Sequence, residues 1–210
     1  FTWKCVNHDN SPHIVERNYP SMARDVVRFL DDNKISKVDV IGHSMGGKTA
    51  MTLALSFPIR VNRLAIVDIA PVSYNHNYEQ LLGNLRGLKL GEIRRRADAN
   101  RMLAEAIDDD ELRLFLLQNL VIKAGEAATW RINLDAIRDH VNHLVQYTPQ
   151  EVGKFAGPTS VVRGELSPYV QDSHLPVIRN LFPAARLHTI AGAGHWPHAQ
   201  KPADFLSCIR

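Results

Sequence analysis

Short runs of β-branched and other apolar residues alternate along this chain with longer stretches whose apolar residues recur at helical spacing. The strand-like runs cover residues 1–6, 38–41, 63–69, 159–163 and 186–190. Helical stretches follow Ser21, which is expected to cap the first of them, and cover 48–57, 174–181 and the end of the chain from Ala203. Alternation of this kind is typical of a mostly parallel sheet with helices on both faces, so the pattern predicts the α/β class.

Between the third and fourth strand-like runs, from about Tyr74 to Thr148, the strand pattern disappears. Helices are predicted there over 91–107, 110–121 and 134–147. A helical block between two strands of one sheet is an insertion. We therefore expect a core made of two parts, 1–73 and 149–210, interrupted by a helical insertion over 74–148.

Composition and charge exclude several classes of function. The 210 residues are 45% hydrophobic and 22% charged, which is typical of a globular enzyme. A formal net charge of +3, with a short basic run at Arg94, Arg95 and Arg96, does not favour nucleic acid as a partner. No stretch approaches the roughly 18 apolar residues of a membrane span. Two cysteines, Cys5 and Cys208, predict free thiols in place of a disulfide framework.

A tight turn after the second strand-like run carries the candidate chemistry. Residues 42–46 read Gly-His-Ser-Met-Gly, which fits G-x-S-x-G, and an Ala- and Leu-rich helix follows. In a strand–turn–helix context, a sharp turn projects the serine hydroxyl toward a base, and the glycines remove side chains that would clash. The motif predicts Ser44 as a nucleophile and the backbone N–H of Met45 as a donor to an oxyanion.

A glycine-rich loop near the end of the sequence supplies the candidate base. The segment 192–195 reads Gly-Ala-Gly-His and lies between the last strand-like run and the last helix. In a parallel sheet this loop lies at the same edge as Ser44. A neutral imidazole can accept the serine proton and return it to a leaving group. His195 is the predicted base, and His198, further along the same loop, is the alternative.

Three carboxylates compete for the role of orienting this base. Asp68 stands near the tip of an apolar strand, where burial of a lone charge is costly. Glu165 follows the next strand of the core. Asp135 lies in the helical insertion, where a charge also complements a helix N-terminus. The sequence favours Asp68 and leaves Glu165 and Asp135 as alternatives.

No cofactor is predicted. His140 and His143 lie three residues apart on a predicted helix, but no carboxylate or cysteine pattern completes a metal site around them. No G-x-G-x-x-G follows a strand and no phosphate-binding loop is identified, so a nucleotide cofactor is unsupported.

Longer blocks of the sequence resemble a known family, the α/β-hydrolase domain-containing protein 11 group and its small bacterial esterase relatives. The resemblance covers essentially the whole sequence. The blocks that carry it are NHDNSPH over 7–13, GHSMGGKTA over 42–50, VDIAPV over 67–72, WRINL over 130–134, SPYV over 167–170 and AGHWPHA over 193–199. Together they are far more specific than G-x-S-x-G alone.

This resemblance implies an α/β-hydrolase fold and a hydrolase of carboxylic or thio esters that needs no cofactor. The implied substrates are small-molecule acyl esters, including acylglycerols. Ser44 is implied as nucleophile and His195 as base, while the bacterial relatives favour Asp68 as the acid and the animal group points to Asp135. The implied location is intracellular: mitochondrial in a eukaryote and cytoplasmic in a bacterium.

In such a hydrolase, the insertion over 74–148 is expected to act as a lid. Its apolar residues are expected to form an acyl pocket or to pack the lid itself. They are Leu81, Leu82, Leu114, Phe115, Leu117 and Trp130.

Two departures from the family pattern bear on activity. Asp9 and Asn10 stand where the family has Gly-Asp. The family's first strands, whose His-Gly loop supplies a second oxyanion donor, are absent from this sequence, which is therefore expected to be a piece of a longer protein. The alternative function is a catalytically inactive α/β-hydrolase-like binding module, which the missing strands favour and the intact Ser44 and His195 oppose. Protein partners are not predicted.

Overall fold

The protein is described by a computed structural model that covers residues 18–74, 78–135, 137, 146–148 and 153–210. The predicted strand over 1–6, Cys5, the block over 7–13, and the pair His140 and His143 lie outside the described residues. The chain divides into two compact units. One consists of 1–15 with 75–142, and the other of 16–74 with 143–210.

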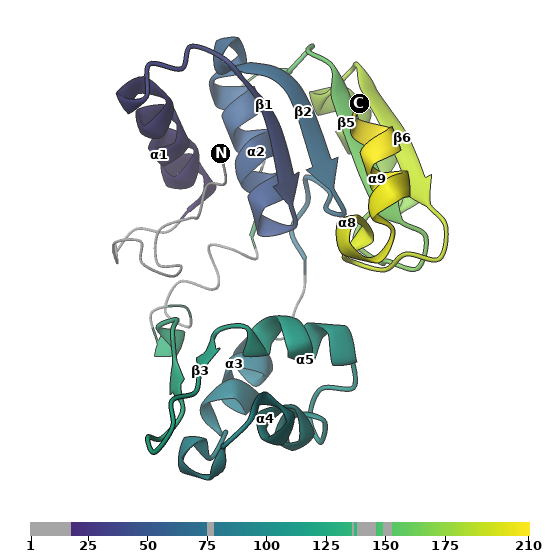
Figure 1. The fold of residues 1–210 in the computed structure, drawn as a ribbon. Coiled ribbons are helices and arrows are strands. Elements are labelled where there is room, and N and C mark those ends of the chain that lie inside the picture. Colours follow the sequence, from purple (N-terminus) through teal and green to yellow (C-terminus); the bar gives the residue numbers. More distant parts are fainter. Residues whose placement is uncertain (1–17, 75–77, 136, 138–145, 149–152) are drawn as a thin grey trace. The chain divides into compact units, whose positions relative to one another are not determined.

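A four-stranded sheet forms the centre of the second unit within the described residues (Figure 1). Its strands lie in the order β1, β2, β5, β6, and every neighbouring pair is parallel. They are β1 Val38–His43, β2 Val61–Val67, β5 Thr159–Gly164 and β6 Ala185–Ile190. The predicted α/β class is confirmed, although β2 begins and ends two residues before the predicted run.

Helices pack on this sheet from different parts of the chain. Its described residues form the α-helices α1 Tyr19–Asp32, α2 Met45–Ser56, α7 Leu175–Leu181, α8 Pro197–Gln200 and α9 Pro202–Ile209. Helix α2 packs on β1 and β2, α1 packs on α2, and α9 packs on β5 and β6. Successive residues of a strand face opposite sides of a sheet, and both Val161 and Val162 of β5 are fully buried. Strand β5 is therefore covered on both faces at this point, as is typical of a strand inside a parallel sheet.

Helix α1 begins two residues before the predicted cap. Asn18 is the N-cap: its side chain accepts the N–H of Ser21 at 2.8 Å, and the hydroxyl of Ser21 accepts the N–H of Asn18 at 3.3 Å. Pro20 lies in the first turn, where its fixed φ suits a helix and its missing N–H costs nothing. The prediction that Ser21 caps this helix was wrong, because Ser21 is the reciprocal partner of the true cap.

The strand register brings the residues that follow β1 and β2 to one edge of the sheet. His43 is level with Val67, and Val67 is level with Val162. The N–H of Ser44 donates to the carbonyl of Val67 at 3.1 Å, and the N–H of Asp68 donates to that of Val162 at 2.7 Å. Each candidate residue is thus tied by its backbone to the neighbouring strand.

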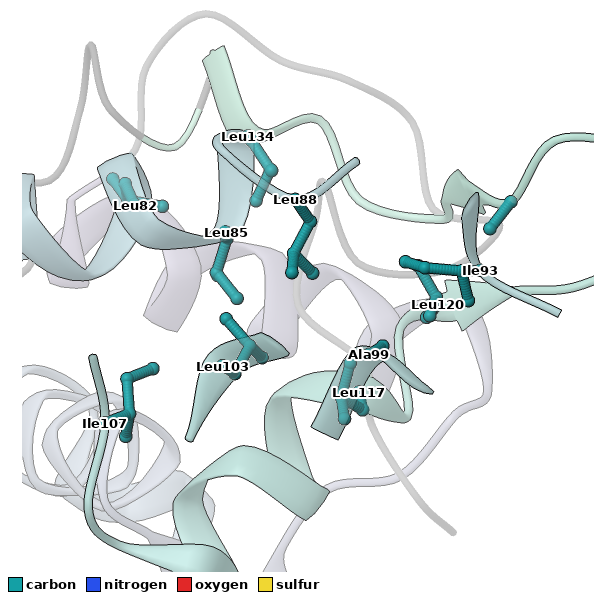
Figure 2. Packing of buried hydrophobic residues seen from close by; sticks show 11 residues of the cluster. Leu82, Leu85, Leu88, Ile93, Ala99, Leu103, Ile107, Leu117, Leu120 and Leu134 are labelled. Atoms are coloured by element: carbon teal, nitrogen blue, oxygen red, sulfur yellow. The ribbon is translucent and has the colours of Figure 1, made fainter. Parts of the chain in front are cut away.

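The other unit has its own hydrophobic core (Figure 2). Its described residues form the α-helices α3 Tyr78–Arg86, α4 Arg96–Leu103 and α5 Asp110–Leu117, and a short hairpin that pairs β3 Leu120–Val121 with β4 Thr129–Trp130. Buried side chains from α3, α4, α5 and β3 converge in the core. The labelled ones are Leu82, Leu85, Leu88, Ile93, Ala99, Leu103, Ile107, Leu117, Leu120 and Leu134.

This unit differs from the prediction at three points. Strands β3 and β4 lie in a segment where none was expected, because strands of two residues are too short to show alternation. Helix α5 ends at Leu117, where the predicted helix continued to residue 121. The helix predicted over 91–107 is a short 3₁₀ turn, Leu90–Glu92, followed by α4.

The apolar residues expected in the lid divide into two groups. Leu82 and Leu117 are buried in the core of their own unit, and Leu81 and Trp130 pack against it. Leu114 and Phe115 are 52% and 47% exposed. Most of these residues therefore pack the unit itself, and a lid or acyl-pocket role stays a prediction.

None of the helices in the described part of the chain is both long enough and apolar enough to span a membrane.

Candidate active site

The connection between β1 and α2 consists of a single residue, Ser44. Its backbone has φ 52° and ψ −119°, a conformation that costs a residue with a side chain about 1–3 kcal/mol. Hydrogen bonds hold this turn on both sides, since the N–H of Ser44 bonds to Val67 and its carbonyl accepts the N–H of Lys48 at 3.1 Å. A Cβ on Gly42 would lie 2.3 Å from the carbonyl oxygen of Gly46, so only glycine fits there. The serine side chain is thus presented on a sharp, fixed turn.

Helix α2 starts directly after this serine. Met45 is its first residue, and the N–H groups of a first helical turn have no acceptor within the helix. The partial positive charge of the helix N-terminus lies at the same place. The N–H of Met45 is therefore suited to bind a negatively charged oxygen beside Ser44.

Asp68 follows β2 and is fully buried, with a φ of 50°. Its carboxylate accepts three hydrogen bonds. The N–H of Gly164 donates to Oδ1 at 3.0 Å, Nδ1 of His195 donates to Oδ2 at 2.7 Å, and the hydroxyl of Ser167 also donates to Oδ2. Charge-assisted hydrogen bonds of this kind offset the cost of burying a carboxylate. They also fix the orientation of the His195 ring.

The loop that carries His195 passes over the end of β5. The N–H of Leu166 donates to the carbonyl of Ala193 at 2.9 Å. A Cβ on Gly164 would lie 2.1 Å from the carbonyl oxygen of Gly194 and 2.5 Å from that of Ala193. The missing side chain at Gly164 lets the loop cross β5 and bring His195 to Asp68.

Replacing Gly164 by Ala is expected to lower kcat/KM for an ester substrate about 100-fold. The new methyl group must displace the backbone that precedes His195, and a misplacement of about 1 Å at a reacting group can cost this much. Steady-state kinetics with a p-nitrophenyl ester measure the effect. Gly194→Ala is the control, because its Cβ would meet only Gln200 side-chain atoms at 3.5 Å or more. Equal activity of the two variants would contradict the prediction.

His43, the residue before Ser44, anchors the same loop. Its Nε2 donates to the backbone carbonyl of His195 at 2.7 Å, and the two rings lie 4.7 Å apart. Burial, with the nearby His195, lowers the pKa of His43 to about 4. His43 is therefore neutral near pH 7 and acts as a hydrogen-bond donor.

His198, the alternative base, contacts other groups. Its ring lies 4.7 Å from that of His43 and 5.9 Å from that of Phe205. Burial, with His195 as a second cause, lowers the pKa of His198. Its Nδ1 is buried without a hydrogen-bond partner among the described residues. Within that part of the chain, the histidine bonded to Asp68 is His195.

The two alternative acids have other partners. Glu165 is exposed, and its Oε2 accepts the N–H of Gly192 at 2.8 Å, so it fastens the start of the glycine-rich loop. Asp135 forms an ion pair with Arg86 at 3.0 Å, and its side chain is 63% exposed. Of the three candidates, the structure brings Asp68 to His195.

Sequence reasoning assigned no role to Ser167 or His43. Ser167 donates to Asp68, and His43 donates to the backbone of His195. Ser167 lies in the block SPYV, one of those that carry the family resemblance, and membership of this block was the signal that could have marked it as a site residue. His43 occupies the first variable position of G-x-S-x-G. Neither position shows a pattern that predicts its contact partner, because those partners are more than 90 residues away in sequence.

Residues 42–49 also fit the phosphate-binding pattern G-x-x-x-x-G-K-[ST], which sequence reasoning overlooked. A phosphate-binding loop of this type needs several backbone N–H groups around an open cradle and a lysine that reaches into it. Here the strand and the helix are separated by Ser44 alone. A Cβ on Gly47 would lie 2.5 Å from the side chain of Ile69, and Lys48 is 3% exposed. The geometry therefore does not fit a nucleotide phosphate.

Lys48 instead lies among tyrosine rings. Its Nζ lies 5.6 Å from the ring centre of Tyr19, 4.9 Å from that of Tyr74 and 5.4 Å from that of Tyr147. The electron-rich face of an aromatic ring attracts an ammonium group. Burial nevertheless lowers the pKa of Lys48 to about 8, because the charged form loses its water.

The free energy of unfolding is expected to rise by about 2 kcal/mol between pH 7.5 and 9.5, relative to a Lys48→Met variant. In this window the unfolded lysine, with a pKa near 10.5, still binds a proton that the folded lysine has lost, so raising the pH favours the folded state. Urea unfolding across this pH range measures the difference. An exposed control, Lys89→Met, should follow the wild-type curve. Parallel curves for wild type and Lys48→Met would contradict the assignment.

Two remaining features are the groups that could bind a metal ion and the thiol of Cys208. Among the described residues, no group of three or more His, Cys, Asp and Glu side chains is placed to hold a metal ion. Cys208 on α9 is a free thiol, and its Sγ donates to the carbonyl of Asp204.

Known proteins resemble this chain over nearly its whole length. A family model described as alpha/beta hydrolase fold matches residues 6–202. The sn-1-specific diacylglycerol lipase ABHD11 of Mus musculus is 37% identical over 209 residues, which are 97% of this chain and 67% of that protein. The chain thus spans about two thirds of the length of this relative. Esterase YbfF of Escherichia coli (strain K12) is 35% identical, over 97% of this chain and 78% of its own length.

Among solved structures, a marine microorganism esterase superposes with a TM-score of 0.88 at 35% sequence identity. The match covers 97% of this chain and 80% of that one. A thioesterase domain from the curacin biosynthetic pathway, at 21% identity and a TM-score of 0.68, shares the fold. The predicted fold is confirmed by these matches and by the parallel sheet.

Proposed function

The chain belongs to the alpha/beta hydrolase fold family and is a carboxylic-ester hydrolase; from this premise we propose that it works as a serine hydrolase through an acyl-enzyme. The observation that carries the proposal is the 2.7 Å hydrogen bond between the buried Asp68 and His195, at the sheet edge where Ser44 occupies its strained turn. A nucleophile, a base and an orienting acid at one edge are what this chemistry requires.

The proposed reaction has two halves. Oγ of Ser44 attacks the acyl carbonyl while Nε2 of His195 takes the serine proton, and the N–H of Met45 donates to the oxyanion. His195 then returns the proton to the leaving alcohol or thiol, which departs and leaves the acyl group on Ser44. Water attacks this ester with His195 again as base, and the carboxylic acid is released. Asp68 holds the imidazole in the required tautomer throughout.

The proposed substrates are small-molecule acyl esters, including thioesters and lipid-like acylglycerols. The names of the relatives support this class, since one is a diacylglycerol lipase and another an esterase. For a eukaryotic source, the family resemblance further suggests a mitochondrial location. A fluorescent fusion of the full-length gene product, imaged in cells, tests that location.

Labelling with a biotinylated fluorophosphonate, followed by mass spectrometry of the labelled peptide, tests the proposed mechanism. The expected result is one modified residue, Ser44, together with turnover of p-nitrophenyl acetate, butyrate and octanoate by the same preparation. Competition by a diacylglycerol for the labelling reaction would support the lipid-like substrates. A folded chain that takes up no label and turns over none of the esters would instead favour the inactive binding module.

A further inference from the structure

The imidazole of His195 has a neighbour that the proposed chemistry does not use. The ring of Tyr169 stacks on it, with ring centres 4.1 Å apart and an angle of 28° between the planes. Tyr169 is half-buried and lies in the loop that follows β5. Asp68 holds the His195 ring at its edge, through Nδ1, so the stack adds a contact on the face of the same ring.

The backbone of Tyr169 is fixed from two sides. Its N–H donates to Oγ of Ser167 at 3.3 Å, and the Ser167 hydroxyl in turn donates to Asp68. Its carbonyl accepts the hydroxyl of Tyr74, which also accepts the N–H of Ala70 at 2.8 Å. Segments that follow both β2 and β5 thus hold Tyr169 in place.

The side chain of Tyr74 supports the stack as well. The rings of Tyr74 and Tyr169 meet edge to face, with centres 5.4 Å apart and an interplanar angle of 61°. Burial raises the pKa of Tyr74 to about 12, so its hydroxyl keeps its proton and can donate to Tyr169 over the range in which a serine hydrolase works. Tyr74 thus contacts Tyr169, and Tyr169 contacts His195.

A ring in this position suits a base that alternates between neutral and charged forms. When His195 takes the serine proton it becomes a cation, and the electron-rich face of an aromatic ring attracts a cation. The stack also restricts rotation of the imidazole about its Cβ–Cγ bond. An aliphatic side chain would fill the same space and would supply neither the electron-rich face nor a flat stacking surface.

We propose that Tyr169, held by Tyr74, is a positioning residue that stacks on His195 and stabilises its cationic form during ester hydrolysis. The inference rests on the proposed function, because it requires His195 to act as the base. Among the described residues, the titratable groups that contact or face His195 are Asp68, His43 and His198, together with Tyr169 itself. Replacing Tyr169 leaves Asp68, His43 and His198 in place.

The test compares Tyr169→Leu with Tyr169→Phe in the same chain. Replacement by Leu removes the ring and is expected to lower kcat for p-nitrophenyl butyrate about 10-fold, with KM within about twofold of wild type. Replacement by Phe keeps the ring face and is expected to retain kcat within about twofold. The proton NMR signal of the Nδ1–H···Asp68 hydrogen bond is expected to broaden or shift in the Leu variant and to persist in the Phe variant.

Two outcomes would overturn the inference: an unchanged kcat in Tyr169→Leu, or an equal loss in both variants. Thermal unfolding shows whether each variant is folded. If Tyr169→Leu does not fold, Tyr74→Phe serves instead. It removes the hydroxyl that holds the Tyr169 carbonyl and is expected to lower kcat about threefold, so an unchanged kcat there also overturns the inference.

Fluorophosphonate labelling separates the failure of the proposed function from the failure of this inference. If Ser44 of the wild type takes up no label, the proposed function is contradicted. If the wild type is labelled and Tyr169→Leu keeps its kcat, only the role of Tyr169 is contradicted.

Discussion

Ser44→Ala is expected to abolish fluorophosphonate labelling and to lower kcat for p-nitrophenyl esters about 10⁶-fold. Without the hydroxyl no acyl-enzyme forms, and any remaining hydrolysis must come from water. Alanine, like serine, carries a Cβ, so the variant meets the same backbone strain at the positive φ of this position. The substitution removes only one oxygen atom, and the fold should change little. Steady-state kinetics, with thermal unfolding to confirm folding, measure the effect. Ser207→Ala, on α9, is a control that should keep full activity.

A Ser44→Ala variant that is folded and still hydrolyses esters within tenfold of the wild type would contradict the acyl-enzyme mechanism. In that case His195 and Asp68 would have to activate water directly on the ester. Incubation of the wild type with a slow ester, followed by intact-mass measurement, would then show no acyl adduct. An adduct that is present in the wild type and absent in Ser44→Ala supports the mechanism.

Asp68→Asn is the second large expected effect, a fall in kcat of about 10⁴-fold. The amide keeps the shape of the carboxylate but lacks its charge. An Asn that presents its N–H₂ group to Nδ1 also favours the tautomer in which Nε2 carries the proton and cannot accept one from Ser44. Steady-state kinetics at pH 7.5 measure the fall.

The other two candidate acids provide matched controls. Glu165→Gln removes a charge from an exposed side chain that bonds to Gly192, and Asp135→Asn removes one from the ion pair with Arg86. Both variants are expected to keep kcat within about threefold of wild type. A loss of 100-fold or more in either of them, with an active Asp68→Asn, would assign the acid elsewhere.

The parts of the core that sequence could predict are those that depend on local pattern. The runs at β1 and β5 were identified because they are rich in β-branched residues. The turn at Ser44 was identified because the G-x-S-x-G motif is a short, contiguous pattern. The choice of Asp68 rested on its position at the tip of an apolar strand, a local signal with a clear energetic reason.

Contacts across the sheet could not be predicted in the same way. That Ser167 and Gly164 both donate to Asp68 depends on the register between β2 and β5, and a segment of about 90 residues separates those strands. The capping of α1 by Asn18 was missed for a different reason. Ser21 has the side chain of a typical cap, and only the reciprocal hydrogen bonds show which of the two residues starts the helix.

The hydrogen bond between Asp68 and His195 joins residues 127 positions apart. A contact of such long range closes a large loop at an entropic cost, so we expect it to form after the strands of the sheet have paired. During refolding, hydrolytic activity should therefore return after the helical signal in far-ultraviolet circular dichroism. Since the same pairing also holds Ser44 on its turn, we expect each molecule to gain its esterase activity late in folding, and partly folded chains to contribute none.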